Sequence, residues 1–288
     1  MKKTHMLKVA VVLLLSGMLL GSTPSGSYPG EDVEMSTVVY KGHHFKVVEI
    51  NRAKERIKAK YFAFKEDNKS VSQRYEEWKY GKSIVLVSSG TYMDGAGTPQ
   101  GLTIDNGRLV NESLGAWDAL AIVYATGGIA VADLKNNKVN IKCGSALQHF
   151  DVKNNSYEKQ QFIQCAQSVS ATTFQTHLLV YNDQVRVAPN ASTTPRERRF
   201  LIAAKKNDVL YHVVINIQEY GSLLDRTNEA YKFMKEELGY TNIIYMLNLD
   251  VGAQDIYKVF NPDGTERADM SGAKPLSTAA NLVVYYYE

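Results

Sequence analysis

The stretch LYHVVINIQEYGSLLDRTNEAYKFMKEELGYTNIIYMLNL, residues 210–249, decides the fold class of this chain. Residues 210–217 form a compact apolar run of the kind found in covered strands. Residues 222–238 carry one apolar stripe at helical spacing and stop before Gly239, a residue typical of the position after a helix. Residues 243–249 are a second apolar strand. The order strand, helix, strand predicts a right-handed crossover between parallel strands.

Outward from this unit, short apolar runs alternate with turn signals. Asp105-Asn106-Gly107, Gly127-Gly128 and Asn182-Asp183 each separate two apolar runs and predict hairpins. Two further helices are expected at 72–80 and 156–168, and the polar residues 189–199 are expected to form a loop. We therefore predict an α/β (α+β) fold: a single domain with a mixed β-sheet, hairpins and at least one parallel βαβ crossover.

The first residues have the three parts of an export signal. Three lysines precede the apolar run 9–20, and small residues follow it from Gly21. The run is short for a membrane-spanning helix, although an uncleaved anchor is the alternative. We predict a signal peptide over 1–21, a polar tether over 22–35 and one domain over 36–288. The mature protein is expected outside the cytoplasm, with no membrane association beyond the export signal.

Charge and cysteine content narrow the classes of partner. The chain has 33 basic and 30 acidic residues, and three of the lysines lie in the signal. The mature chain is therefore neutral, which argues against nucleic acid as a partner because that binding depends on phosphate neutralisation. Cys143 and Cys165 either form a disulfide, as export permits, or are two buried thiols. No spacing of metal ligands stands out, and the sequence indicates no particular cofactor.

Four blocks of sequence, taken in order, resemble a known family. They are Val87–Tyr92 continuing through Gly97–Arg108, Gln175–Val180, Arg198–Ala203 and Leu247–Gln254. Their order and flanking strands are similar to those of the phosphodiester glycosidase family, whose domain occurs in the enzyme that uncovers mannose 6-phosphate signals. The resemblance implies hydrolysis of the bond between the anomeric carbon of a sugar and a phosphodiester, with a sugar phosphate or phosphoglycan as substrate.

The resemblance also assigns roles to residues. It implies that Asp250 activates water or stabilises the sugar cation and that Arg199 binds the phosphate. Glu197 is a candidate second carboxylate only because it is close in sequence to Arg199. The resemblance further implies a set of substrate-binding residues, namely Asn248, Gln175, Gly252, Ser88, Gly90 and Arg198.

The chain also departs from the family pattern. Ser88 stands where the family has asparagine, and Val251 stands where it has glycine in the loop that follows Asp250. A β-branched residue restricts the backbone and the approach of a ligand there. The alternative function is therefore a non-catalytic protein that binds phosphoglycan or sugar phosphate on the same fold, and an envelope structural protein is a third. At the level of single residues, the alternatives are a solvated arginine loop at 196–199 and a helix-capping role for Asp250.

Overall fold

The computed structural model describes residues 32–288, apart from 54–55, 64–68 and 253. The predicted signal peptide lies outside the described residues, as does most of the predicted tether. β1 begins at Val33, so the last three residues assigned to the tether belong to a strand. No described helix is long and apolar enough to cross a membrane.

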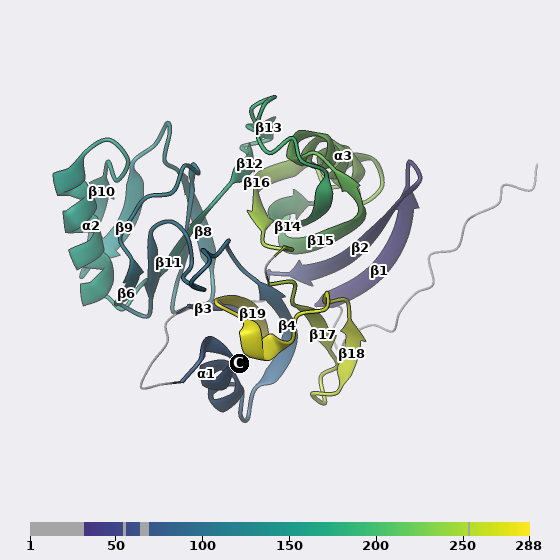
Figure 1. Cartoon of the computed structure of the whole chain (residues 1–288), viewed down its shortest axis with the longest axis horizontal. Coiled ribbons are helices and arrows are strands. Elements are labelled where there is room, and N and C mark those ends of the chain that lie inside the picture. Colours follow the sequence, from purple (N-terminus) through teal and green to yellow (C-terminus); the bar gives the residue numbers. More distant parts are fainter. Residues whose placement is uncertain (1–31, 54–55, 64–68, 253) are drawn as a thin grey trace, which may run out of the picture.

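Strands are the main secondary structure of the described part of the chain, and they form four sheets (Figure 1). The largest sheet has, in spatial order, β1 (Val33–Tyr40), β2 (His43–Asn51), β15 (Val209–Gly221), β14 (Arg196–Lys206), β16 (Asn242–Leu249), β12 (Leu178–Tyr181) and β13 (Gln184–Val185). A second sheet has β6 (Arg108–Asn111), β5 (Thr103–Asp105), β11 (Thr172–Thr176), β7 (Ala119–Val123) and β8 (Ile129–Asp133).

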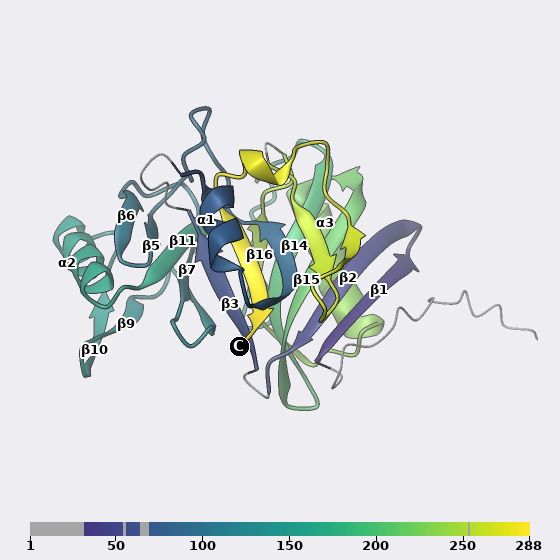
Figure 2. The ribbon, with the colours of Figure 1, turned by 90° about the horizontal axis from the view of Figure 1, so that it is seen from below.

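The third sheet has β18 (Glu266–Asp269), β17 (Tyr257–Phe260), β4 (Ser83–Ser89), β19 (Leu282–Tyr287) and β3 (Ile57–Phe62). A two-stranded sheet pairs β9 (Val139–Cys143) with β10 (Ala146–Phe150). The helices are α1 (Val71–Trp78), α2 (Ser156–Ser168) and α3 (Leu223–Glu236), with a short 3₁₀ turn at Leu276–Thr278. Helix α1 packs beside β3 and the 3₁₀ turn, close to the third sheet (Figure 2).

The prediction that the two strands of the crossover pair with each other is wrong. The unit β15–α3–β16 exists, and Ser222 caps α3 by accepting a hydrogen bond from the backbone of Asp225. However, β14 lies between β15 and β16 and pairs antiparallel with both of them. The two strands therefore run in the same direction without hydrogen bonding, and every pairing among the described strands is antiparallel. The sheets are not mixed, and the fold is mostly β.

The three large sheets share one apolar core. Leu201 and Val214 of the first sheet, Phe174 of the second, and Tyr61 and Val85 of the third belong to the same buried cluster. The rings of Tyr61 and Phe174 stack with centroids 4.5 Å apart, which joins the second and third sheets. A second cluster covers the other face of the largest sheet with α3. Aromatic stacking and burial of this extent fix the sheets relative to one another.

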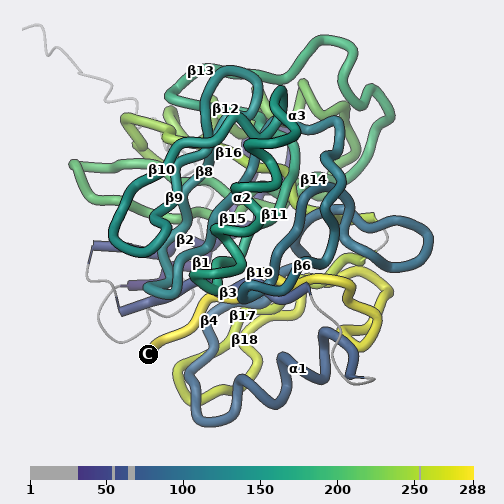
Figure 3. The backbone as a smooth tube through the Cα atoms, turned by 90° about the vertical axis from the view of Figure 1, so that its left-hand side faces the viewer, coloured from purple at the N-terminus to yellow at the C-terminus, as the bar shows by residue number. Residues whose placement is uncertain are grey.

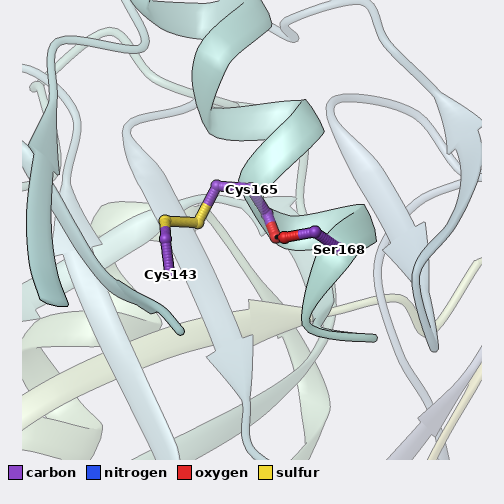
Figure 4. Close-up of a disulfide and its surroundings, with 3 residues drawn as sticks. All are labelled: Cys143, Cys165 and Ser168. Carbon is purple, nitrogen blue, oxygen red and sulfur yellow. Dashed lines mark hydrogen bonds between the residues drawn. A yellow bond between two sulfur atoms is a disulfide. The ribbon is translucent and has the colours of Figure 1, made fainter. Parts of the chain in front are cut away.

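The module of β9, β10 and α2 is held by a covalent bond. Cys143 at the end of β9 and Cys165 in α2 form a disulfide, with Cα atoms 5.5 Å apart (Figure 4). The hydroxyl of Ser168 donates to the Cys165 carbonyl at 2.8 Å in the last turn of α2. Of the two alternatives for the cysteines, the structure has the disulfide.

The loop predicted at 189–199 extends too far, because its last four residues belong to a strand. β14 begins at Arg196, and the side chains of Arg198 and Arg199 are buried there. The reason is the sheet, since Arg198 and Arg199 pair with Ile217 and Asn216 of β15, and Arg199 also pairs with Leu249 of β16. The alternative of a solvated arginine loop therefore does not hold for these two residues.

Candidate active site at the end of β16

Asp250 follows the last residue of β16 and is tied to the segment after β4. Its backbone N–H donates to the carbonyl of Gly90 at 2.8 Å, and its own carbonyl accepts from the Ser89 hydroxyl at 2.5 Å. Its Oδ1 accepts from the Gly252 N–H at 2.9 Å, which closes a turn; no described helix starts here for it to cap. Burial raises the pKa of the Asp250 carboxyl, and the Gly252 N–H and Arg199 oppose the shift.

Asn248 and the rings of Tyr92, Trp117 and His177 lie together beside Asp250. We call these three rings the aromatic wall. The Asn248 amide donates to the Tyr92 hydroxyl, and its Oδ1 is buried with no partner among the described residues. The ring of Trp117 lies 5.0 Å from that of Tyr92 and 5.6 Å from that of His177. Burial raises the pKa of Tyr92 to about 12 and lowers the pKa of His177 to about 4. Both side chains are therefore neutral at neutral pH.

Arg198 is a buried cation that has no acidic partner in the described part of the chain. Its Nη2 donates to the Thr194 carbonyl at 3.0 Å and has longer contacts with Ser192, while its Nε has no partner among the described residues. Burial lowers the pKa of Arg198. Its positive charge adds to the fall in the pKa of His177, which places Arg198 within electrostatic reach of the aromatic wall.

Arg196 brings a second positive charge to this place. Its Nη1 lies 3.7 Å from where a Cβ on Gly252 would stand, and the Asp250 Oδ1 lies 3.4 Å from the same point. Both contacts are of ordinary van der Waals length, so Gly252 is not required by close packing. Arg196 is exposed, unlike Arg198, and the two arginines therefore offer one exposed and one buried guanidinium for an anion.

Arg199 lies in a different environment from Arg198, because neighbouring side chains of a strand point to opposite faces. The Arg199 side chain is fully buried, and its guanidinium donates to Asp255 Oδ1 at 2.6 Å. Its remaining partners are Asn216 Oδ1 at 3.1 Å, Ser89 Oγ at 3.2 Å and the Ile256 carbonyl at 2.8 Å. The guanidinium carbon also lies 4.5 Å from the centre of the Tyr257 ring. These contacts join the first and third sheets and leave little of Arg199 for a phosphate.

Glu197 is on the side of Arg199. Its Oε1 accepts from the Asn216 amide at 2.6 Å, and the same amide accepts from Arg199 through its oxygen. Glu197, Asn216, Arg199 and Asp255 thus form one chain of polar contacts behind Asp250. We predicted Glu197 as a second carboxylate, but its Oε1 already accepts a hydrogen bond from Asn216.

Gln175 orients other parts of the site. Its amide nitrogen donates to the carbonyls of Gly115 and Trp117, at 3.1 and 2.6 Å. Its Oε1 accepts from the N–H groups of Leu102 and Gly115, at 3.1 and 2.8 Å. All four capacities of the buried amide are used. Gln175 therefore holds the segment that carries Trp117, with no group left over for a sugar.

Ser88 and Gly90 are structural as well. Ser88 is buried in β4 between Tyr257 and Val283, and its hydroxyl donates to the Ser89 carbonyl at 2.9 Å. A Cβ on Gly90 would lie 2.4 Å from Asn281 Oδ1 and 2.7 Å from the Tyr61 ring. Only glycine fits at that distance. The backbone carbonyl of Gly90 makes the contact with Asp250.

Of the predicted residues, the fold brings Asp250, Asn248, Gly252 and Arg198 to one place. Arg199 and Glu197 lie behind it, and Gln175, Ser88 and Gly90 support it. Sequence reasoning did not assign Tyr92, Trp117 or Arg196 to the site. Tyr92 is the last residue of the segment Val87–Tyr92, which resembles the family, whereas nothing in the sequence connects Trp117 with His177. Among the described residues, no three side chains of the types His, Cys, Asp and Glu gather as metal ligands.

Comparisons with known proteins give a similarity of fold. No protein-family model matches the chain, and no curated protein is significantly similar in sequence. Among solved structures, the chain is similar to the catalytic domain of zebrafish N-acetylglucosamine-1-phosphodiester alpha-N-acetylglucosaminidase, auto-inhibited by its pro-peptide. The TM-score is 0.49 at 12% identity, covering 89% of this chain and 82% of that one. It is also similar to a hypothetical protein from Synechocystis, with a TM-score of 0.45 at 12% identity, covering 89% and 62%. These similarities concern the fold alone.

Proposed function

We propose that this protein is an exported phosphodiester glycosidase that releases a sugar from a sugar-1-phosphodiester and leaves a phosphomonoester. The observation that carries the proposal is Arg198, a buried guanidinium with no acidic partner and an unsatisfied Nε among the described residues. The charges of both Arg198 and Asp250 act on the pKa of Tyr92, which places the two groups within electrostatic reach of that ring. A buried charge is costly unless it is paired, so this arrangement suits an anionic ligand.

The chemistry follows from what surrounds the two groups. Ionised Asp250 takes a proton from water, the water oxygen attacks the anomeric carbon, and the bond from that carbon to the phosphate oxygen breaks with its electron pair leaving on the phosphate. Arg198 and Arg196 stabilise the departing phosphomonoester. The rings of Tyr92 and Trp117 offer apolar faces to the sugar, and the free Oδ1 of Asn248 accepts from a sugar hydroxyl.

The alternative is a protein that binds sugar phosphate or phosphoglycan without cleaving it. It is favoured by Glu197, whose Oε1 is engaged by Asn216, and by Asp250, whose Oδ1 is engaged by Gly252. Two arginines can bind a sugar phosphate, whereas glycoside hydrolysis generally uses two carboxylates, and this site has one that is partly engaged.

The test is the release of free sugar from an N-acetylglucosamine-1-phosphodiester by the mature protein, with and without chelator and added divalent cations. Asp250→Asn should lower kcat by about 1,000-fold, the usual effect of losing a general base. The matched control is Asp208→Asn, in the exposed turn between β14 and β15, where φ is +61° and asparagine is well tolerated. Saturable binding without any release would replace the glycosidase with the binding protein.

A further inference from the structure

Two cavities lie between the turn that joins β8 to β9 and the hairpin of β12 and β13. Figures 1 and 3 both place β8 beside β12. The first cavity, of about 310 Å³, is lined among others by Asp118, Asp133, Lys135, Leu178 and Arg186. The second, of about 400 Å³, is lined among others by Tyr124, Asn137, Lys138, Asn140, Tyr181 and Asn182. The same two elements line both cavities, which follow one another along them.

The first cavity begins where the aromatic wall of the candidate site ends. Asp118 is the chain neighbour of Trp117, and Leu178 is the chain neighbour of His177. The negative charge of Asp118 acts on His177 and opposes the fall in its pKa. A ligand that lies on the wall can therefore continue into the first cavity.

The first cavity has charges of both signs with a net of one positive charge, since Lys135, Arg186 and Lys153 stand against Asp118 and Asp133. The carboxylate of Asp133 is engaged by the Lys135 N–H at 3.0 Å and by the Asn136 amide at 2.7 Å, and Asp118 pairs with Lys153. The side chains of Lys135 and Arg186 are exposed and have no ion pair among the described residues. Among the described residues, Lys135 and Arg186 exceed by one charge the acid that has no cationic partner, Asp133, and this excess suits an anionic group.

The second cavity is lined by neutral groups that suit sugar hydroxyls. Asn137 and Asn182 bring amides, and Tyr124 and Tyr181 bring rings with hydroxyls. Its lysine, Lys138, is 3.3 Å from Glu158 and is thereby paired. Each cavity has the volume of a small-ligand site, at the lower end of the usual range.

We propose that this crevice is a binding groove for an extended anionic glycan, a chain of sugar units linked by phosphodiesters, which leads to Asp250. The proposal rests on the proposed function for the placement of the reacting bond and deepens it by naming a polymer as the substrate. The phosphate after the first sugar lies against Lys135 and Arg186, and the next sugar lies against the asparagines and tyrosines.

The test uses oligomers of N-acetylglucosamine 1-phosphate with one to four repeats, titrated into the full-length Asp250→Asn protein by calorimetry. The Kd should fall from one to three repeats and then level off. Lys135→Ala with Arg186→Ala should raise the Kd of the trimer about tenfold and leave that of the monomer unchanged. The control removes two exposed lysines that line neither cavity, Lys82→Ala with Lys232→Ala, and should change neither Kd. Equal melting temperatures check that the variants are folded.

The outcomes separate this proposal from the proposed function. A Kd independent of length, or an equal effect of the control pair, overturns the groove even if the wild-type protein releases sugar from a monomeric diester. Binding that tightens with length, without release of sugar by the wild-type protein, keeps the groove and overturns the glycosidase.

Discussion

Arg198 is a buried cation whose contacts in the described structure are all with neutral groups. Such a residue lowers stability unless a ligand neutralises it, whereas a structural arginine such as Arg199 has its acid beside it. The two adjacent arginines therefore differ in what their removal would do. The difference comes from the face of β14 on which each side chain lies.

Replacing Arg198 should separate function from folding. We expect Arg198→Ala to lower kcat/KM for the phosphodiester about 100-fold, the effect of losing one charged contact to the transition state. The melting temperature should stay the same or rise, because an unpaired buried charge is removed. Steady-state kinetics and thermal melts measure both effects, and Arg198→Lys is the conservative control. A large fall in melting temperature with full activity would contradict this role.

The raised pKa of Asp250 predicts two pH dependences. Since the folded protein holds the Asp250 proton to higher pH than the unfolded chain, this group stabilises the fold in acid, and the stabilisation is lost as the pH rises through the raised pKa. In the Asp250→Asn variant the side chain at this position is neutral at every pH. Its melting temperature should therefore match that of the wild type in acid and exceed it at neutral pH. Wild-type activity should fall with decreasing pH as Asp250 becomes protonated.

Thermal melts between about pH 4 and pH 8 test the stability prediction, because this window brackets a raised aspartate pKa. Asp208→Asn, an exposed matched substitution, should show no such crossover. An Asp250→Asn protein that is less stable than the wild type at neutral pH would mean that the carboxylate is stabilised in the fold, against the direction given by its burial.

At the scale of elements, the junction between β4 and β16 sets the position of the site. Gly90 follows β4, and its carbonyl accepts from Asp250 just after β16. Within the third sheet, Asn281 and Tyr61 lie so close to Gly90 that a side chain there has no room. The first and third sheets also meet at Arg199 and Asp255. Both contacts decide where the carboxyl of Asp250 lies.

Two glycines near the site should respond differently to alanine. Gly90→Ala places a methyl group against Asn281 and the ring of Tyr61, and should cost about 1–3 kcal/mol of unfolding free energy through overpacking. Gly252→Ala meets only ordinary contacts and should leave the stability nearly unchanged. Denaturant unfolding of both variants makes the comparison, and equal losses would contradict the close approach at Gly90.

Arg199→Ala should act on folding. The substitution would leave the carboxylate of Asp255 without its buried partner. We expect a loss of about 3–5 kcal/mol. Asp255→Asn and the double variant complete the thermodynamic cycle, in which the double variant should lose less than the sum of the two single ones. Additive losses would show that the pair is not coupled.

At the scale of the whole molecule, a disulfide-bonded module lies beside the larger sheets. β9, β10 and α2 have their own apolar cluster with β5 and β7, and the bond between Cys143 and Cys165 closes it. The module is distinct from the residues around Asp250. Its stability and the chemistry of the site can therefore be tested apart.

Removing the disulfide should lower the stability and spare the activity. The bond closes a loop with a sequence separation of 22, for which the chain-entropy relation gives about 3 kcal/mol. Cys143→Ser with Cys165→Ser should show that loss in denaturant unfolding, with unchanged kcat for a monomeric diester. Reductant should lower the melting temperature of the wild type and not that of the double variant. A reductant effect on both proteins would assign the loss to something else.

Local pattern was enough to predict most elements. The helix at 156–168 and the hairpins at Asn106-Gly107 and Asn182-Asp183 are present because the turn residues adopt positive φ and the apolar spacing matches the buried face. The hairpin of β9 and β10 was not predicted, since residues 146–149 of β10 are exposed and give no alternating apolar signal. The strand pairing of β15 with β16 was predicted wrongly, because local spacing does not reveal that β14 lies between them.

The sequence by itself determined most of the strands and helices, the turns at Asn106-Gly107 and Asn182-Asp183, and that Asn248 and Asp250 lie at the end of one strand. These features depend on spacing along the chain, which the sequence contains. Only the tertiary structure decided that Arg198 is unpaired while Arg199 is paired, and that Trp117, His177 and Tyr92 meet. Those relations depend on which faces of separate strands come together, and that is fixed by the burial of the shared core.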